Sequence, residues 1–366
     1  MTRSYLDWNA TAPLRPEARA AMVDAMDLVG NPSSVHGEGR AAKALMERCR
    51  AEIAESLGAD SADLAFTSGA TEAAALALKG RTVVSSAVEH DCVFAWAGGA
   101  PALPVGKDGV IGLEPVGDRE GADGVWAVQA ANSETGIVQD LSRVRSAIPM
   151  GAVFLTDAVQ VVGKKSFAFE WSGADMALVS AHKAGGPKGV GALVLRRGLE
   201  VEAVLRGGGQ EMSRRAGTEN LVGMAGFAAT AKASQRDLER GEWERVAELR
   251  KILENLLEAG DHPTISVGKD AARLPNTLCV IAPGWKGETQ VMRMDLEGFA
   301  ISAGSACSSG KVRESRVLRA MGYGDGEADC AVRISLGPTV TEQEVRRFAD
   351  AWRRARDKAM ARQRAG

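Results

Sequence analysis

Short apolar runs alternate along much of the chain with longer stretches in which apolar residues recur at helical spacing. Strands are predicted at residues 64–66, 82–86, 125–129, 153–156, 176–179 and 192–195. Helices are predicted over residues 16–28, 40–57 and 71–80, and the turn formers of residues 30–40 predict a loop. Strands interleaved with helices form a mostly parallel sheet covered on both faces, so the pattern predicts an α/β domain.

The pattern changes after a leucine-rich helical stripe that ends at Gly260. Strands are then predicted at residues 276–281, 299–302 and 331–336, between helices, which is an α+β pattern. The last helix begins with Thr341-Glu-Gln-Glu344, a capping box, and buries Val345, Phe348, Ala349 and Trp352. We therefore expect a large domain over residues 15–258 and a small domain built from residues 1–14 and 259–366.

Polar residues follow the predicted strands of the large domain. They are Thr71 after the first, His90 after the second, Asn132, Ser133 and Glu134 after the third, Asp157 and Gln160 after the fourth, and Ser180, His182 and Lys183 after the fifth. The ligand crevice of an open α/β sheet lies at the carboxyl ends of its strands. The sequence therefore predicts one polar site at this edge.

Lys183 stands in a His-Lys pair at the mouth of a Gly- and Pro-rich turn, directly after a buried strand. Burial lowers the pKa of a lysine amine and makes the amine available for a Schiff base. Asp157 ends another apolar strand. Pyridoxal phosphate needs an amine for its aldehyde and an acid for its pyridinium nitrogen, so the pair favours this cofactor over a surface lysine in a turn.

A phosphate site is predicted where the strand at residues 64–66, the small-residue loop Thr67–Ala70 and the helix opened by Thr71 meet. The first N–H groups of a helix are unpaired, and its dipole favours an anion. A plain strand-to-helix turn with Ser/Thr capping is the alternative.

The net charge of −2 offers no global basic field for nucleic acid or membrane surfaces. No apolar run approaches a membrane span and the N-terminus lacks a signal-peptide core, so we expect a cytoplasmic protein. The five scattered cysteines form no metal-ligand pair or disulfide framework. Cys49 and Cys279 fall on apolar stripes and are expected to be packing residues.

Cys307 lies in Gly304-Ser-Ala-Cys-Ser-Ser-Gly310, a run of small residues that gives it nothing bulky to pack against. We expect this thiol to be exposed and reactive. Arg333 points opposite to Val332 and Ile334 in its predicted strand, and its fork suits a substrate carboxylate; a surface ion pair is the alternative.

The chain resembles the cysteine desulfurases of the class V, fold-type I aminotransferase superfamily over essentially its whole length. The blocks that carry the resemblance are residues 5–11, 31–37, 66–72, 89–90, 132–136, 157–160, 180–183 with 186–189, 207–211, 215–218 and 304–310. The resemblance implies a fold-type I transferase with a large, mostly parallel sheet domain and a smaller α+β C-terminal domain. It also implies pyridoxal 5'-phosphate as cofactor, L-cysteine as substrate and a homodimer.

The resemblance assigns roles residue by residue. Lys183 holds the cofactor, Asp157 pairs with the pyridinium, and Gln160 with Asn132 and Ser133 faces the phenolic oxygen. His90 stacks on the ring and takes part in proton transfer; Ala70, Thr71, Ser180 and His182 hold the phosphate. Thr218 reaches the cofactor phosphate of the other subunit, Arg333 binds the substrate carboxylate and Cys307 takes the sulfur, as a persulfide.

The chain departs from the family pattern at several positions. Trp8 stands where Asn is usual, Ser133 replaces the second Asn, Ala74-Ala75 replaces an Asn pair, Gly185 replaces an aromatic residue and Pro338 replaces a common Arg. Two further hypotheses follow: a selenocysteine lyase, and a sulfur-relay protein that depends on a partner. The sulfur acceptor stays open among an iron–sulfur cluster scaffold, a tRNA-thiolation protein and a molybdenum-cofactor protein.

Overall fold

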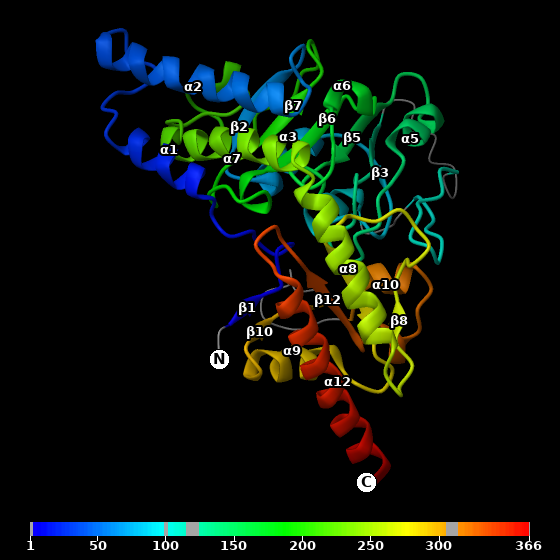
Figure 1. Cartoon of the computed structure of the whole chain (residues 1–366). Coiled ribbons are helices and arrows are strands. Elements are labelled where there is room, and N and C mark those ends of the chain that lie inside the picture. The colour runs from blue at the N-terminus through cyan, green and yellow to red at the C-terminus, as the bar shows by residue number, and fades with distance from the viewer. Residues whose placement is uncertain (1–2, 99–101, 115–123, 305–313, 366) are drawn as a thin grey trace.

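The computed structural model describes residues 3–98, 102–114, 124–304 and 314–365. The elements lie in two lobes, and helix α8 (Glu242–Glu258) leads from the upper lobe into the lower one (Figure 1). No helix in these ranges is long and apolar enough to cross a membrane.

The upper lobe is built on a six-stranded sheet. Its strands are β2 (Asp63–Thr67), β3 (Val83–Ser85), β4 (Val125–Ala127), β5 (Val153–Asp157), β6 (Met176–Ser180) and β7 (Gly191–Leu195), in the spatial order β2-β7-β6-β5-β4-β3. Strands β3 to β6 are parallel, and β7 runs antiparallel to both β2 and β6. The strands β2 to β6 therefore end at one edge of the sheet, as the sequence predicts.

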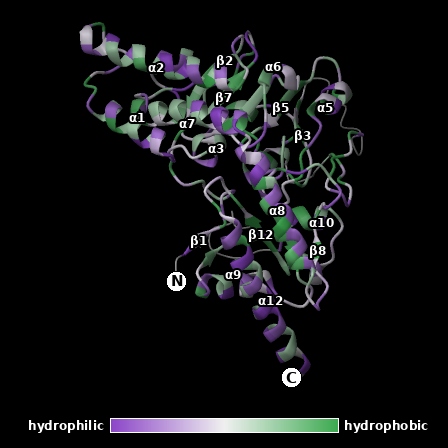
Figure 2. Ribbon diagram, in the orientation of Figure 1, coloured by the Kyte–Doolittle hydropathy of each residue, from purple (hydrophilic) through white to green (hydrophobic). Residues whose placement is uncertain are grey.

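Helices cover both faces of this sheet. On one face α1 (Pro16–Met26), α2 (Gly37–Ser56) and α7 (Leu221–Glu239) pack together, and Ile53 and Phe227 share a core with Phe154 of the sheet. On the other face α3 (Ala70–Leu78) shares a second core with the sheet, which includes Leu76 of the helix and Leu178 of β6. Figure 2 shows the strands hydrophobic, with hydrophilic residues along the outer helices. The shorter helices are α4 (Asp91–Phe94), η1 (Ala95–Ala97), α5 (Leu141–Ala147), α6 (Phe169–Ser172), η2 (Ala181–Lys183) and η3 (Gln210–Ser213).

The lower lobe has a four-stranded antiparallel sheet in the order β11-β12-β9-β8. Its elements are β8 (Ile265–Ser266), β9 (Thr277–Ile281), α9 (Gly287–Leu296), β11 (Ser302–Ala303), α10 (Arg316–Ala320), α11 (Asp325–Ala328), β12 (Ala331–Ser335) and α12 (Glu342–Ala365). The N-terminal strand β1 (Ser4–Tyr5) pairs in parallel with β10 (Phe299–Ala300). The N-terminus thus joins the lower lobe, while the domain limits 15–258 and 259–366 stay a prediction.

The structure confirms the predicted capping box at the start of the last helix and corrects the predicted end of the loop over residues 30–40. The capping box is present: the amide N–H of Thr341 donates to Glu344 Oε2 at 2.9 Å, and the N–H of Glu344 donates to Thr341 Oγ1 at 3.3 Å. The loop predicted over residues 30–40 is wrong at its end, because α2 begins at Gly37. His36 caps this helix by accepting the N–H of Gly39 through Nδ1, which turn composition did not reveal.

Candidate active site

The carboxyl ends of the strands open into a cavity of about 530 Å³. Most of the predicted site residues line it: Ala70, Thr71, His90, Ser133, Asp157, Gln160, Ser180, His182 and Lys183. Asn132, Thr218 and Arg333 are not part of this wall. Cys307 lies outside the described residues.

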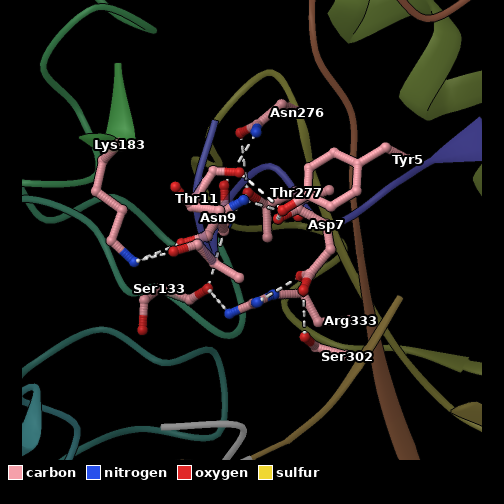
Figure 3. Close-up of polar contacts among 12 residues, drawn as sticks. Tyr5, Asp7, Asn9, Thr11, Ser133, Lys183, Asn276, Thr277, Ser302 and Arg333 are labelled. Atoms are coloured by element: carbon pink, nitrogen blue, oxygen red, sulfur yellow. Dashed lines mark hydrogen bonds and ion pairs between the residues drawn. The ribbon is translucent and has the colours of Figure 1, made fainter. Parts of the chain in front are cut away.

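Lys183 ends the 3-10 helix that follows β6, which delivers its amine to the cavity. Its Nζ donates to the backbone carbonyls of Asn9 at 2.7 Å and Ala10 at 2.9 Å (Figure 3). The N-terminal segment therefore crosses from the lower lobe to hold the lysine that the sequence singled out.

Asp157 ends β5 on the same cavity, where its Oδ1 accepts the N–H of Val159 at 2.9 Å. Burial raises the pKa of this carboxyl above its ordinary value, while His90 and Lys183 oppose the shift. A buried carboxylate of this kind gains stability from a cationic neighbour, such as a protonated ring nitrogen.

His90 precedes the short helix α4 and caps it. Its Nδ1 accepts the backbone N–H of Cys92 at 3.2 Å and lies 3.0 Å from the Cys92 Sγ. Because Nδ1 is an acceptor here, the neutral ring carries its proton on Nε2. Cys92 also lines the cavity, and burial raises the pKa of its thiol.

The turn from β2 into α3 has the geometry expected of the predicted phosphate site. Gly69 has φ of 157°, a conformation that disfavours a side chain, and α3 begins at the next residue. Its first-turn N–H groups have no partners within the helix. The pKa of His182 falls to about 4 through burial and the nearby lysines, so the ring is neutral near pH 7. His182 Nδ1 lies 3.1 Å from the Thr11 hydroxyl.

Behind the cavity, Asn9 is fully buried and joins the two lobes (Figure 3). Its Nδ2 donates to Thr277 Oγ1 at 2.8 Å and to the Ser133 carbonyl at 3.2 Å. Its own carbonyl accepts Gln160 Nε2 at 3.2 Å as well as Lys183. Asn9 thereby connects the loop after β4, the turn after β5 and the lower-lobe strand β9.

Arg333 projects from β12 toward this network, as its strand position predicts, but it is 3% exposed. Its Nη2 pairs with Asp7 Oδ1 at 2.7 Å and its Nη1 donates to the Ser133 carbonyl at 3.0 Å (Figure 3). The surface ion pair considered as an alternative is therefore a buried one. Asn132 Oδ1 accepts the N–H groups of Glu134 and Thr135 at 2.9 and 2.8 Å, so its amide orders the loop that presents Ser133.

These residues fit pyridoxal phosphate. A strand-end lysine, a buried carboxylate and a helix N-terminus open into one cavity, which matches the amine, acid and anion contacts that this cofactor requires. No cluster of metal-ligating side chains is found in the part of the chain that the structure describes. The fold and the site thus have the features expected of a lysine-dependent pyridoxal phosphate enzyme.

The comparisons specify the family. Residues 4–348 match the aminotransferase class-V family model, so the chain belongs to that family. A cysteine desulfurase from Cereibacter sphaeroides is 38% identical, with 96% of this chain and 95% of that protein covered. The cysteine desulfurase IscS of Dictyoglomus turgidum is 34% identical, with 97% and 94% covered. A solved NifS-like protein from Rickettsia africae has a TM-score of 0.90 at 31% identity, covering 97% and 99%.

Sequence patterns do not single out three residues that lie in or beside the site: Asn9, Cys92 and Lys164, whose Nζ donates to Gln160 Oε1 at 2.6 Å. Asn9 lies within the block of residues 5–11, but its partners are far along the chain. Lys164 stands four residues after Gln160, and this spacing is the only sequence feature that connects it to the site. Cys92 stands two residues after His90, but it is one of five scattered cysteines and no sequence pattern indicates a place in the site.

Proposed function

We propose that the chain is a pyridoxal phosphate-dependent cysteine desulfurase that converts L-cysteine to L-alanine and takes the sulfur on Cys307. The convergence of Lys183 and Asp157 on one cavity carries this proposal. The names of the relatives from Cereibacter sphaeroides and Dictyoglomus turgidum support the choice of substrate.

The cavity residues divide the binding of the cofactor among them. Lys183 holds it, Asp157 stabilises its ring nitrogen, and His90 covers the ring. Ala70, Thr71, Ser180 and His182 bind the phosphate; Gln160 and Ser133 face the phenolic oxygen, and Asn132 acts on that oxygen through the loop it orders. When bound, pyridoxal phosphate accepts the electron pair released at Cα of the amino acid.

The residues of the chain then handle protons and sulfur. Lys183 Nζ removes the Cα proton of L-cysteine. The Cys307 thiolate attacks the substrate sulfur, so an S–S bond forms as the substrate Cβ–S bond breaks, and protonation of the remaining carbon leaves L-alanine. Arg333 binds the substrate carboxylate. To do so it exchanges Asp7, its partner at 2.7 Å, for the substrate.

The active unit in this proposal is a cytoplasmic homodimer. Thr218 is exposed and absent from the cavity wall of its own chain, which leaves it free to serve the site of a second copy. The persulfide then passes to a sulfur-acceptor protein, such as an iron–sulfur cluster scaffold.

Lys183→Ala tests the assignment. Purified wild type incubated with pyridoxal phosphate is expected to be yellow, to hold the cofactor covalently after borohydride reduction, and to release alanine from L-cysteine without another protein. Lys183→Ala should lose all three properties. Covalent retention in the variant would refute the role of Lys183, and alanine release that requires a second protein would favour the sulfur-relay hypothesis.

A further inference from the structure

Lys164 is a buried lysine beside the site, in the turn that follows β5. The residue is 1% exposed. Its Nζ donates to Gln160 Oε1 at 2.6 Å and to Asn9 Oδ1 at 3.1 Å. The charges that act on it from the described residues are those of Lys183 and Arg333, both positive.

This environment is unfavourable for an ammonium group. Burial and the two like charges lower the pKa of Lys164 well below its ordinary value. Neutral amide oxygens are its only hydrogen-bond acceptors in the described structure, and an apolar side chain of similar length would avoid the desolvation cost. We therefore expect Lys164 to contribute by orienting neighbouring side chains and not by stabilising the fold.

The amide of Gln160 is what Lys164 orients. Both hydrogen-bond partners of Lys164 Nζ are amide oxygens, to which either a protonated or a neutral amine donates, so Lys164 holds the amide oxygen of Gln160 toward itself. The Nε2 group then faces the other way and donates to the Asn9 carbonyl at 3.2 Å, the same carbonyl that binds Lys183 at 2.7 Å. Gln160 lines the cavity, and its Nε2 shares the Asn9 carbonyl with Lys183 Nζ, another group of the cavity wall.

We propose that Lys164 is a positioning residue: it fixes Gln160 as a hydrogen-bond donor toward the cavity and, through Asn9, steadies the carbonyl that holds Lys183. This inference rests on the proposed function, since the acceptor of the Gln160 N–H is the phenolic oxygen of the cofactor. Without Lys164, the Gln160 amide is free to rotate by half a turn. Gln160 Oε1, an acceptor, then faces the phenolic oxygen of the cofactor in place of the Nε2 donor.

Lys164→Met tests this, with Lys165→Met as the matched control, because Lys165 is the adjacent lysine and is exposed. The readouts are the thermal midpoint of the apoprotein and the affinity for pyridoxal phosphate, titrated by fluorescence. Lys164→Met is expected to keep or raise the midpoint and to weaken cofactor binding about tenfold, the effect of one hydrogen bond. Lys165→Met should change neither. A residue that only supports the fold would lower the midpoint instead.

A double-mutant cycle with Gln160→Ala makes the test specific. Gln160→Ala should weaken binding by itself, and adding Lys164→Met should then cause a smaller loss than Lys164→Met causes in the wild-type background. The inference would be overturned if the fold-losses of cofactor affinity in the two single variants multiplied in the double variant. It would also be overturned if Lys164→Met bound the cofactor with wild-type affinity.

If Lys164→Met does not fold, Gln160→Glu tests whether the N–H group of Gln160 contributes to cofactor binding. A Glu side chain still accepts a hydrogen bond from Lys164 but offers no N–H to the cavity. We expect Gln160→Glu to bind the cofactor as weakly as Gln160→Ala, and wild-type affinity would overturn the inference. Wild type that binds no cofactor at all would refute the proposed function and not the orientation of Gln160.

Discussion

Asp7→Asn changes the charge balance around Arg333 with almost no change in shape. In the native chain Asp7 Oδ1 pairs with Arg333 at 2.7 Å, and its Oδ2 accepts the Ser302 hydroxyl at 2.8 Å. The side chains of Asp7 and Arg333 are 15% and 4% exposed, so the pair is largely removed from water. Breaking a buried ion pair by removing one partner costs about 3–5 kcal/mol. Asn keeps an oxygen that accepts from Arg333, so we expect a loss of about 3 kcal/mol.

Urea unfolding of the apoprotein, followed by tryptophan fluorescence, measures this loss. Ser302→Ala is the matched control, since it removes one hydrogen bond to Asp7 and leaves both charges, at a cost of about 1 kcal/mol. Asp7→Asn combined with Arg333→Met should be less destabilised than the sum of the single changes. Asp7→Asn should also bind L-alanine more tightly, because Arg333 is then released for the ligand carboxylate. A free energy of unfolding within about 0.5 kcal/mol of wild type, with unchanged L-alanine affinity, would show that the Asp7–Arg333 ion pair neither stabilises the fold nor competes with the ligand carboxylate.

Three further predictions concern packing, pH and assembly. Cys49→Ser and Cys279→Ser should each lose about 1 kcal/mol or more of stability, measured by urea unfolding, because each buries a hydroxyl in an apolar core, while the desulfuration rate stays at the wild-type value. Burial raises the pKa of the Glu89 carboxyl from 4.5 to about 8, so between these pH values the unfolded chain has lost the carboxyl proton that the folded chain keeps, and the free energy of unfolding falls as pH rises. Glu89→Gln should flatten this pH dependence when urea unfolding is measured from pH 4.5 to 8. The same slope in Glu89→Gln and wild type would argue against a raised pKa for Glu89. Mixing Lys183→Ala with Thr218→Ala chains should form heterodimers with one intact site and restore activity in the alanine assay, whereas strictly monomeric, active wild type in sedimentation would contradict shared sites.

Much of the fold could be predicted because its signals are local. The strands of the upper sheet are short apolar runs, and a parallel sheet buried on both faces requires such runs. Their carboxyl ends then bring Asp157 and Lys183 together through topology alone. The capping box at Thr341 is equally local, since its partners are three residues apart.

The remaining part of the site depends on contacts between distant segments. Asn9 bonds Ser133 and Thr277, which are 124 and 268 residues away, and no local pattern identifies those partners. Arg333 could be assigned to the outward face of its strand, but its burial depends on Asp7 crossing from the N-terminus. Lys164 and Lys165 are adjacent lysines that the sequence alone does not distinguish. Only tertiary packing buries Lys164 and leaves Lys165 exposed.

Sulfur transfer to Cys307 is tested by measuring alanine release and locating the transferred sulfur in the same sample. Wild type and Cys307→Ser, both loaded with pyridoxal phosphate, are incubated with L-cysteine; released alanine is quantified and the persulfide is located by mass spectrometry. Wild type is expected to carry a persulfide on Cys307. Cys307→Ser is expected to bind L-cysteine but to release alanine at least about 100-fold more slowly. Alanine release by Cys307→Ser at the wild-type rate, or a persulfide on Cys92 or Cys330, would contradict sulfur transfer to Cys307.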